Sequence, residues 1–206
     1  METKNIKNRV SELKRETNET KIDVKVNLDG NGINNIETGL PFFDHMLEQL
    51  SKHSLIDIIL ICEGDLHIDS HHTVEDIGWA LGKAIDKALG ERKGIKRYSF
   101  SYLPMDECLT RCCVDISGRP WLIWNVFLPS TAINNIETEI FREFFQSLSQ
   151  SAGITLHIEN LYGNNTHHII ESCFKSLAIS LKEAVKIDEN NSENIPSTKG
   201  ILTGSN

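Results

Sequence analysis

The sequence predicts an α+β fold built from two similar halves, each a mixed β-sheet covered by two helices. Two observations lead to this prediction. Strand-like and amphipathic helical segments are mixed along the chain without the regular alternation of parallel α/β proteins. In addition, a helix, a strand, a short polar turn, a His-His pair and a long helix follow one another at 42–89 and again at 139–187. We therefore divide the chain into halves at 1–95 and 96–206, joined as one compact unit.

The first half is predicted to contain three strands and two helices. These elements are expected at residues 20–27, 33–38, 42–50, 55–61 and 73–89. Apolar and polar residues alternate in the first strand, and a turn rich in Gly, Asp and Asn leads into its partner. Pro41 opens the first helix, because proline is favoured in a first helical turn. Thr73 is expected to cap the long helix, and Gly90 to end it.

The second half is predicted to repeat this order. Residues 97–128 contain several strands, two of them at 110–116 and 121–128. A helix at 139–149, a strand at 154–158 and a long amphipathic helix at 167–185 follow, as judged from hydrophobic spacing. The tail after Lys186 is polar and is expected to be irregular.

Composition narrows the class of protein. The chain has 206 residues, of which 39% are hydrophobic and 24% charged, the balance of a globular protein. A formal net charge of -8 argues against a nucleic-acid partner, because phosphate backbones attract positive surface. No apolar run reaches the roughly 20 residues that span a bilayer, and the polar N-terminus lacks a signal-peptide core, so we expect a cytoplasmic protein without a membrane partner. The five cysteines form no C-x-x-C pair, which disfavours a disulfide framework or a four-cysteine zinc site.

Two copies of a His-His-x-x-Glu cluster predict a metal-dependent enzyme. They are HHTVE at 71–75 and HHIIE at 167–171, both at the start of a predicted helix. Adjacent helical side chains diverge by about 100°, so the two histidines of one cluster cannot easily bind the same ion. Each cluster is therefore expected to supply ligands to two different ions, and each metal site is expected to be completed between halves or subunits. The spacing differs from H-E-x-x-H, which disfavours a zinc protease, and the mixed ligands suit manganese, iron or zinc.

Further candidates lie outside the clusters. His45 and His53 stand at the start and end of the first predicted helix, and superposing the halves places Glu143 opposite His45. A basic set comprises Arg97, Arg119, Lys175 and Lys199, each near the end of a predicted element. The last belongs to a Ser-Thr-Lys-Gly loop whose hydroxyls, ammonium and backbone N–H groups can bind a phosphate.

These segments together resemble the imidazoleglycerol-phosphate dehydratases, lyases of histidine biosynthesis. The matching segments run from about residue 9 to residue 202. They are R-x-T-x-E-T at 15–20, TGLPFFDHML, GDLHIDSHHTVEDIGWALGKAI, PMDE at 104–107, VDISGRPW, TLHI at 155–158, GNNTHHIIESCFKSLA and PSTKG. Their number and order make the resemblance far more specific than a single cluster.

The resemblance implies an assembly and a set of site residues. It implies a homo-oligomeric shell of 24 subunits, with two Mn²⁺ ions in each active site at a subunit interface. The implied metal ligands are His45, His71, His72, Glu75, Glu143, His167, His168 and Glu171. Glu143 departs from the family pattern, which often has histidine there. The implied substrate and phosphate contacts are Glu19, His45, His53, Arg97, Arg119, Lys175, Ser197, Thr198 and Lys199.

The activity that the resemblance implies is dehydration of D-erythro-imidazoleglycerol phosphate to imidazole-acetol phosphate. Manganese would hold the substrate ring as its anion, a metal-bound imidazolate, and act as Lewis acid and template. The ring would expel the neighbouring hydroxyl, and Glu19 would take the next proton. The catalytic set is then Glu19, His71, Glu75 and Glu171.

Three other functions are weighed against this one. A metal-storage or metal-sensing shell would use the clusters but leave the phosphate set and Glu19 without a role. A metal-dependent phosphatase of the aspartyl type would need a D-x-D motif, and neither Asp57 nor Asp69 has the second aspartate. A purely structural protein accounts for none of these residues.

Overall fold

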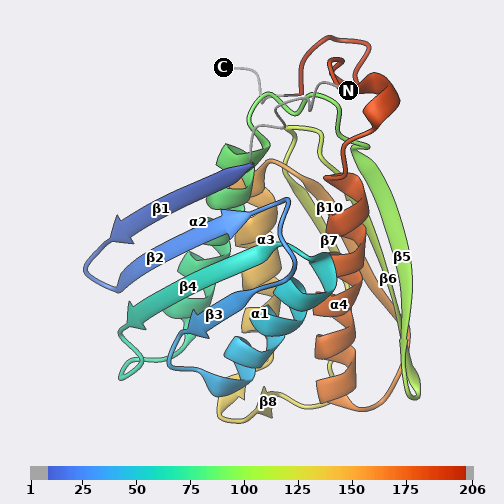
Figure 1. The fold of residues 1–206 in the computed structure, drawn as a ribbon. Coiled ribbons are helices and arrows are strands. Elements are labelled where there is room, and N and C mark those ends of the chain that lie inside the picture. The colour runs from blue at the N-terminus through green and yellow to red at the C-terminus, as the bar shows by residue number, and fades with distance from the viewer. Residues whose placement is uncertain (1–8, 203–206) are drawn as a thin grey trace.

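The computed structural model describes residues 9–202, which form two four-stranded sheets with four helices between them (Figure 1). This confirms the α+β prediction. The first half contains β1 (Val10–Glu16), β2 (Thr20–Asn27), β3 (Asn34–Glu37), α1 (Pro41–Ser54), β4 (Asp57–Gly64) and α2 (His71–Leu89). The second half contains β5 (Tyr98–Met105), β6 (Cys108–Asp115), β7 (Trp121–Asn125), β8 (Ala132–Ile133), β9 (Ile136–Glu137), α3 (Ile140–Ala152), β10 (Thr155–Tyr162) and α4 (Thr166–Ala184). A 3-10 turn (Glu189–Asn191) follows.

The two sheets have the same topology. The strand order is β1-β2-β4-β3 in the first and β5-β6-β10-β7 in the second. In each sheet the first three strands are antiparallel neighbours, and the fourth pairs in parallel with the third. Each strand of one four-stranded sheet therefore has a counterpart in the other, and α1, β4 and α2 correspond to α3, β10 and α4. The repeat read from the two His-His pairs is thus a repeat of structure.

The helices of one half pack against those of the other. Phe43 of α1 contacts Phe174 of α4, with ring centroids 6.3 Å apart, and Phe144 of α3 stacks on the same ring. On the other side, α2 lies close to α3 because Gly78 and Gly82 have no side chain. A Cβ added at Gly82 would lie 2.6 Å from the backbone oxygen of Leu148. Because each long helix packs against the short helix of the other half, the start of each long helix faces that short helix.

Several details differ from the sequence predictions. The strand β1 was not predicted, because Leu13 is its only buried residue and its hydrophobic pattern is weak. Its pairing with β2 fixes it as an edge strand. The prediction that Thr73 caps the long helix of the first half is wrong, since α2 begins at His71 and Thr73 is buried within its first turn. The tail beyond Lys186 is mostly irregular as predicted, but Ile187 forms a bridge with Ile95.

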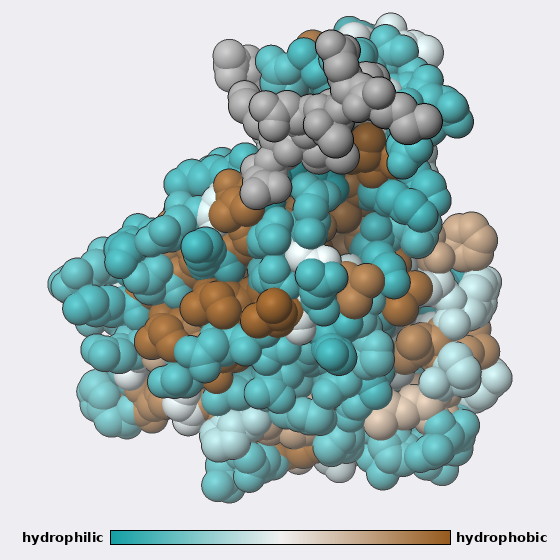
Figure 2. Space-filling model, viewed as in Figure 1, coloured by the Kyte–Doolittle hydropathy of each residue, from teal (hydrophilic) through white to brown (hydrophobic). Residues whose placement is uncertain are grey.

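The surface is largely hydrophilic in the view of Figure 2, with hydrophobic side chains gathered over the strands of the first sheet. Ile59 of β4 belongs to the exposed hydrophobic residues of this sheet. On the second sheet, the exposed residues of β5 and β7 include Tyr98, Phe100, Tyr102 and Trp121. Among the described residues, no helix is both long and apolar enough to cross a membrane.

Candidate metal centre

Both His-His pairs lie at the N-terminus of a long helix, directly after the loop that follows a central strand. Asn165 caps α4, and its side-chain oxygen accepts hydrogen bonds from the backbone N–H groups of His167 and His168 at 3.0 and 3.3 Å. Asp69 accepts the corresponding bond from the N–H of His71 at 2.8 Å. The two helices are thus started by polar residues that precede each pair and fix where the histidines sit.

The histidines of each pair point in different directions, as their helical spacing predicts. The ring planes of His167 and His168 lie at 84° with centroids 6.1 Å apart. The rings of His71 and His72 lie at 78° and 6.4 Å. Each histidine therefore has its own set of neighbours, and the two histidines of one pair can take part in two separate sites.

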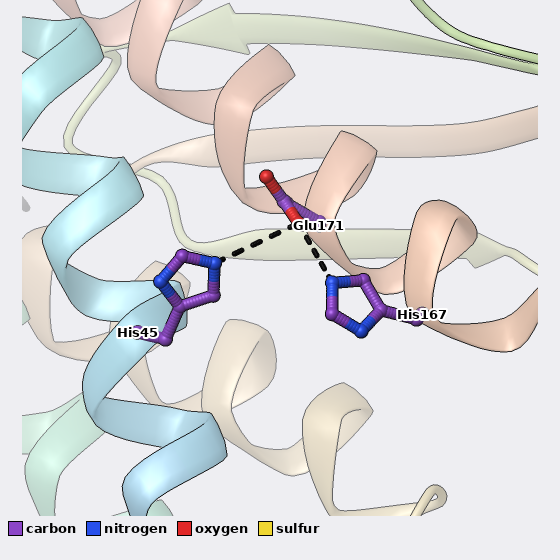
Figure 3. Close-up of side chains that lie close together, drawn as sticks. All are labelled: His45, His167 and Glu171. Carbon is purple, nitrogen blue, oxygen red and sulfur yellow. Dashed lines mark hydrogen bonds and ion pairs between the residues drawn. The ribbon is translucent and has the colours of Figure 1, made fainter.

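His45, His167 and Glu171 converge on one point (Figure 3). The Nε2 atom of His167 lies 2.9 Å from Oε2 of Glu171, and Nε2 of His45 lies 3.8 Å from the same oxygen. One ligand atom from each residue lies within 4.8 Å of the others. His45 comes from α1 and the other two from α4, so the contact between the halves creates the group. Two imidazoles and a carboxylate are a ligand set suited to a divalent transition metal.

Glu171 is held as a buried anion. Only 6% of its side chain is exposed, and Lys175, one turn along α4, lies 2.6 Å from its other oxygen. Burial raises the pKa of this carboxyl, but hydrogen bonds from Lys175 and His167 outweigh burial and leave the pKa below its ordinary value. His53 is near enough for the charges of Lys175 and Glu171 to act on its imidazole. Burial first, and then the charge of Lys175, lower the pKa of the His53 imidazole.

The equivalent residues of the first cluster are more open. Nε2 of His71 lies 3.2 Å from Oε2 of Glu75, whose side chain is 51% exposed. His71 and Glu143 line the same cavity of about 530 Å³, which also contains Trp124. Glu143 is paired with Arg142 at 2.8 Å, and Arg142 lines the same cavity. Of the predicted ligands, His71 and Glu143 thus line a shared cavity, whereas ligand atoms of His45, His167 and Glu171 lie within 4.8 Å of one another.

His72 and His168, the second histidine of each pair, contact carboxylates outside the clusters. Asp65 Oδ2 lies 3.0 Å from Nδ1 of His72, and Glu107 Oε2 lies 2.7 Å from Nδ1 of His168. Glu19 lies on the other side of His72, 3.8 Å from its Nε2. Sequence reasoning named Glu19 but missed Asp65 and Glu107 as site residues. The signal was their position in GDLH and PMDE, two of the segments on which the family resemblance rests.

Part of the predicted basic set gathers around Asp115. The guanidinium of Arg97 is buried against this carboxylate at 2.8 Å, and Arg119 lies 3.8 Å from it. Arg97 also donates a 2.8 Å hydrogen bond to the carbonyl of Pro196, directly before the loop at 197–200. Within that loop, the N–H of Lys199 bonds Oγ of Ser197 at 3.2 Å, while Thr198 and Lys199 are exposed. Lys175 is engaged elsewhere, with Glu171.

Comparison with known proteins identifies the family. A sequence model of imidazoleglycerol-phosphate dehydratase matches residues 38–181. The chain belongs to this family. Its relatives include the imidazoleglycerol-phosphate dehydratases of Sinorhizobium fredii and Agrobacterium fabrum, which are 56% and 57% identical over 194 residues. These alignments cover 94% of the chain and 96% and 98% of the two relatives.

Solved dehydratase structures share the fold. The crystal structure of the Staphylococcus aureus imidazoleglycerol-phosphate dehydratase is 34% identical with a TM-score of 0.79, and covers 87% of this chain and 99% of its own. The Pyrococcus furiosus enzyme, in complex with (S)-C348, is 33% identical with the same TM-score of 0.79, and covers 92% and 100%. The family resemblance inferred from the sequence motifs is confirmed, and the protein is an enzyme of a lyase family.

Proposed function

We propose that the protein dehydrates imidazoleglycerol phosphate to imidazole-acetol phosphate in histidine biosynthesis, with two Mn²⁺ ions in each active site. Family membership supports the reaction. The observation that supports the metal is the convergence of His45, His167 and Glu171, whose ligand atoms lie within 4.8 Å of one another. A buried carboxylate between two imidazoles is the donor set of a divalent-cation site. We place the enzyme in the cytoplasm, as expected for an enzyme of amino-acid biosynthesis.

The residues present would hold the ions in two groups. His45, His167 and Glu171 would hold one ion, and His71, Glu75 and Glu143 would contribute to the equivalent site. His72 and His168, which point away from these groups, would supply further ligands. Manganese, when bound, would supply a Lewis acid that stabilises the substrate ring as an anion.

Glu19 is proposed to move the proton. It lies in the turn between β1 and β2, and the turn is fixed by hydrogen bonds from the backbone N–H groups of Glu19 and Thr20 to Oγ1 of Thr17. After the hydroxyl has left the first side-chain carbon, Glu19 would accept the proton from the second, so that one water is lost in total and the resulting enol becomes the ketone. The hydrogen removed is not acidic in the free substrate, which is why a positioned base alone does not suffice.

The loop at 197–199 is proposed to bind the substrate phosphate. Arg119 and Lys199 supply exposed positive charge, and the hydroxyls of Ser197 and Thr198 can donate to phosphate oxygens. Arg97 holds the carbonyl of Pro196 and so sets the position of the loop. Lys175 and His53, beside Glu171, complete the proposed substrate contacts. An anchored phosphate would fix the reacting carbons relative to Glu19.

A homo-oligomeric shell of 24 subunits is also proposed. The first cluster is open to a neighbouring chain, because the side chains of His71 and Glu75 are 44% and 51% exposed. The aromatic residues on β5 and β7 give the second sheet an apolar outer surface that another copy would cover. Light scattering after gel filtration tests this proposal, and a monomeric mass would contradict it.

The reaction is tested by turnover of the native protein. The protein is stripped with a chelator, manganese is restored, and imidazoleglycerol phosphate is supplied. The expected result is manganese-dependent formation of imidazole-acetol phosphate without free phosphate. Release of inorganic phosphate would instead indicate a phosphatase, and metal binding without any turnover would indicate a storage or sensing protein.

A further inference from the structure

The same hydrogen bond is made twice in the molecule by residues that are not counterparts. His72 and His168 occupy equivalent positions in the two clusters, and each has its Nδ1 atom against a carboxylate, Asp65 at 3.0 Å and Glu107 at 2.7 Å. Asp65 directly follows β4, whereas Glu107 lies in the turn between β5 and β6. Duplication of one half does not by itself produce this arrangement.

The topology shows what stands at the corresponding positions. The strand registers place Gly64 opposite Thr20, and Tyr162 opposite Leu109 after a bulge, so Gly163 corresponds to Gly64 and the residue equivalent to Asp65 is Asn164. The counterpart of Glu107 is Glu19, at the turn before β2. Each half thus provides a carboxylate for the second histidine from a different element, which argues that the contact itself is required.

We propose that Asp65 and Glu107 are positioning residues that hold His72 and His168 with the ring proton on Nδ1. A carboxylate accepts this proton's hydrogen bond and leaves the lone pair on Nε2 for a metal ion. In the structure Nε2 of His168 lies 3.7 Å from the exposed carboxylate of Asp106. The inference rests on the proposed function in so far as the ion is manganese.

Glu107 uses both of its oxygens. While Oε2 contacts the ring of His168, Oε1 accepts hydrogen bonds from the backbone N–H groups of Asn164 and Asn165 at 3.2 and 2.9 Å. Asn165 is the residue that caps α4. Glu107 therefore links the start of the helix to the direction of the ring.

Asp65 is bound differently. Its Oδ2 contacts His72, but its Oδ1 is buried without a hydrogen-bond partner among the described residues. Its own backbone N–H donates to the carbonyl of Glu19 at 3.0 Å, which joins it to the turn that carries the proposed base. An amide at this position can therefore keep an acceptor oxygen on His72.

This difference gives a paired test. In Glu107→Gln only one end can accept hydrogen bonds, so either the backbone N–H groups or the ring loses its acceptor. If the amide NH₂ faces Nδ1, the ring proton moves to Nε2 and blocks ligation. Asp65→Asn can keep its carbonyl on His72. Manganese affinity of the stripped oligomer is measured by equilibrium dialysis, with the exposed Glu12→Gln as the control.

The expected result is a 10- to 100-fold loss of affinity at one of the two ions in Glu107→Gln, on the scale of such outer contacts. We expect a loss of less than about 10-fold in Asp65→Asn and none in Glu12→Gln. If Glu107 acts through His168, adding Glu107→Gln to His168→Ala lowers the affinity no further. Unchanged manganese affinity in Glu107→Gln, or additive losses in the double variant, would overturn the inference.

A second readout separates this inference from the proposed function. ¹⁵N spectra of the histidine rings in metal-free protein report which nitrogen carries the proton. We expect His168 to carry it on Nδ1 in the wild type and to lose this preference in Glu107→Gln, while far-ultraviolet circular dichroism stays unchanged. A wild type that binds manganese without dehydrating the substrate would refute the proposed function alone. A His168 ring protonated on Nε2 in the wild type would refute the positioning role alone.

Discussion

The two His-His-x-x-Glu clusters stand at equivalent places in the two halves but hold their glutamate in opposite ways. The side chain of Glu171 is 6% exposed and is bound by His167 and Lys175. The side chain of Glu75 is 51% exposed and forms an ion pair with His71 at 3.2 Å. One turn further along, the position of Lys175 is occupied in α2 by Trp79, which lies under the guanidinium of Arg15. The two clusters share their ligand types, but the residues around them give their glutamates different environments.

The short helices that face the clusters differ as well. His45 of α1 reaches Glu171, whereas its counterpart Glu143 of α3 is paired with Arg142. The group of His45, His167 and Glu171 is therefore brought together within a single chain. His71 and Glu143 instead line an open cavity that a metal, a substrate or another subunit could fill. The comparison teaches that equal motifs do not give equal sites.

The largest expected effect concerns Glu19, the turn glutamate of the first half. Glu19→Gln is expected to lower turnover by about 10³-fold, the usual contribution of a positioned acid or base, while leaving manganese bound. Steady-state rates and dialysis on the same preparation check both parts, with Glu16→Gln of the same hairpin as the control. Full turnover in Glu19→Gln would show that its assigned role is wrong.

A smaller effect is expected from removing the two cluster glutamates in metal-free protein. Glu171→Ala should lower the free energy of unfolding by about 2–3 kcal/mol, because it removes charged hydrogen bonds in a buried setting. Glu75→Ala should change it by less than about 0.5 kcal/mol, as for an exposed pair. Urea denaturation of the two variants side by side measures the difference. Equal losses would mean that the clusters are energetically alike.

The glycines of α2 provide a test of the helix contacts. Gly82→Ala should lower the free energy of unfolding by about 1–2 kcal/mol, because its new methyl would meet the backbone of Leu148. The counterpart in α4 is Ala178, which is fully buried and tolerates its methyl. Thermal unfolding compares the two positions, and Ala178→Gly should cost about 1 kcal/mol through helix propensity. A more stable Gly82→Ala would show that α2 and α3 can separate at little cost.

The smallest effect depends on pH. Lys175→Met should lower the free energy of unfolding of metal-free protein by about 1 kcal/mol at pH 7, because His167 still bonds Glu171. The folded pKa of Glu171 lies below its ordinary value of 4.5, so its stabilising contribution is present above that value and is lost as the pH falls. The difference between wild type and variant should therefore shrink below about pH 4.5. Urea midpoints from pH 7 to 3.5 follow it, and a constant difference would point to lost packing.

Much of the fold followed from local patterns. The alternation in 20–27 and the helical spacing after Pro41 predicted β2 and α1, and the repeated His-His pair predicted the duplicated topology. The edge strand β1 did not follow, because a strand with one buried residue is fixed by its partner and has a weak pattern of its own. The start of α2 was misplaced by two residues, since Ser70 and Asp69 compete with Thr73 as capping residues.

The sequence by itself determined which residues carry the chemistry and that they occur twice. Residue type sets ligand chemistry, and helical spacing makes adjacent histidines diverge, so neither depends on distant contacts. Only the tertiary structure decided which of them meet. His45 joins Glu171 because α1 packs on the helix of the other half, and Asp65 and Glu107 reach their histidines through loops that no periodicity describes. Contacts between residues far apart in the chain are set by packing, and local sequence patterns do not predict them.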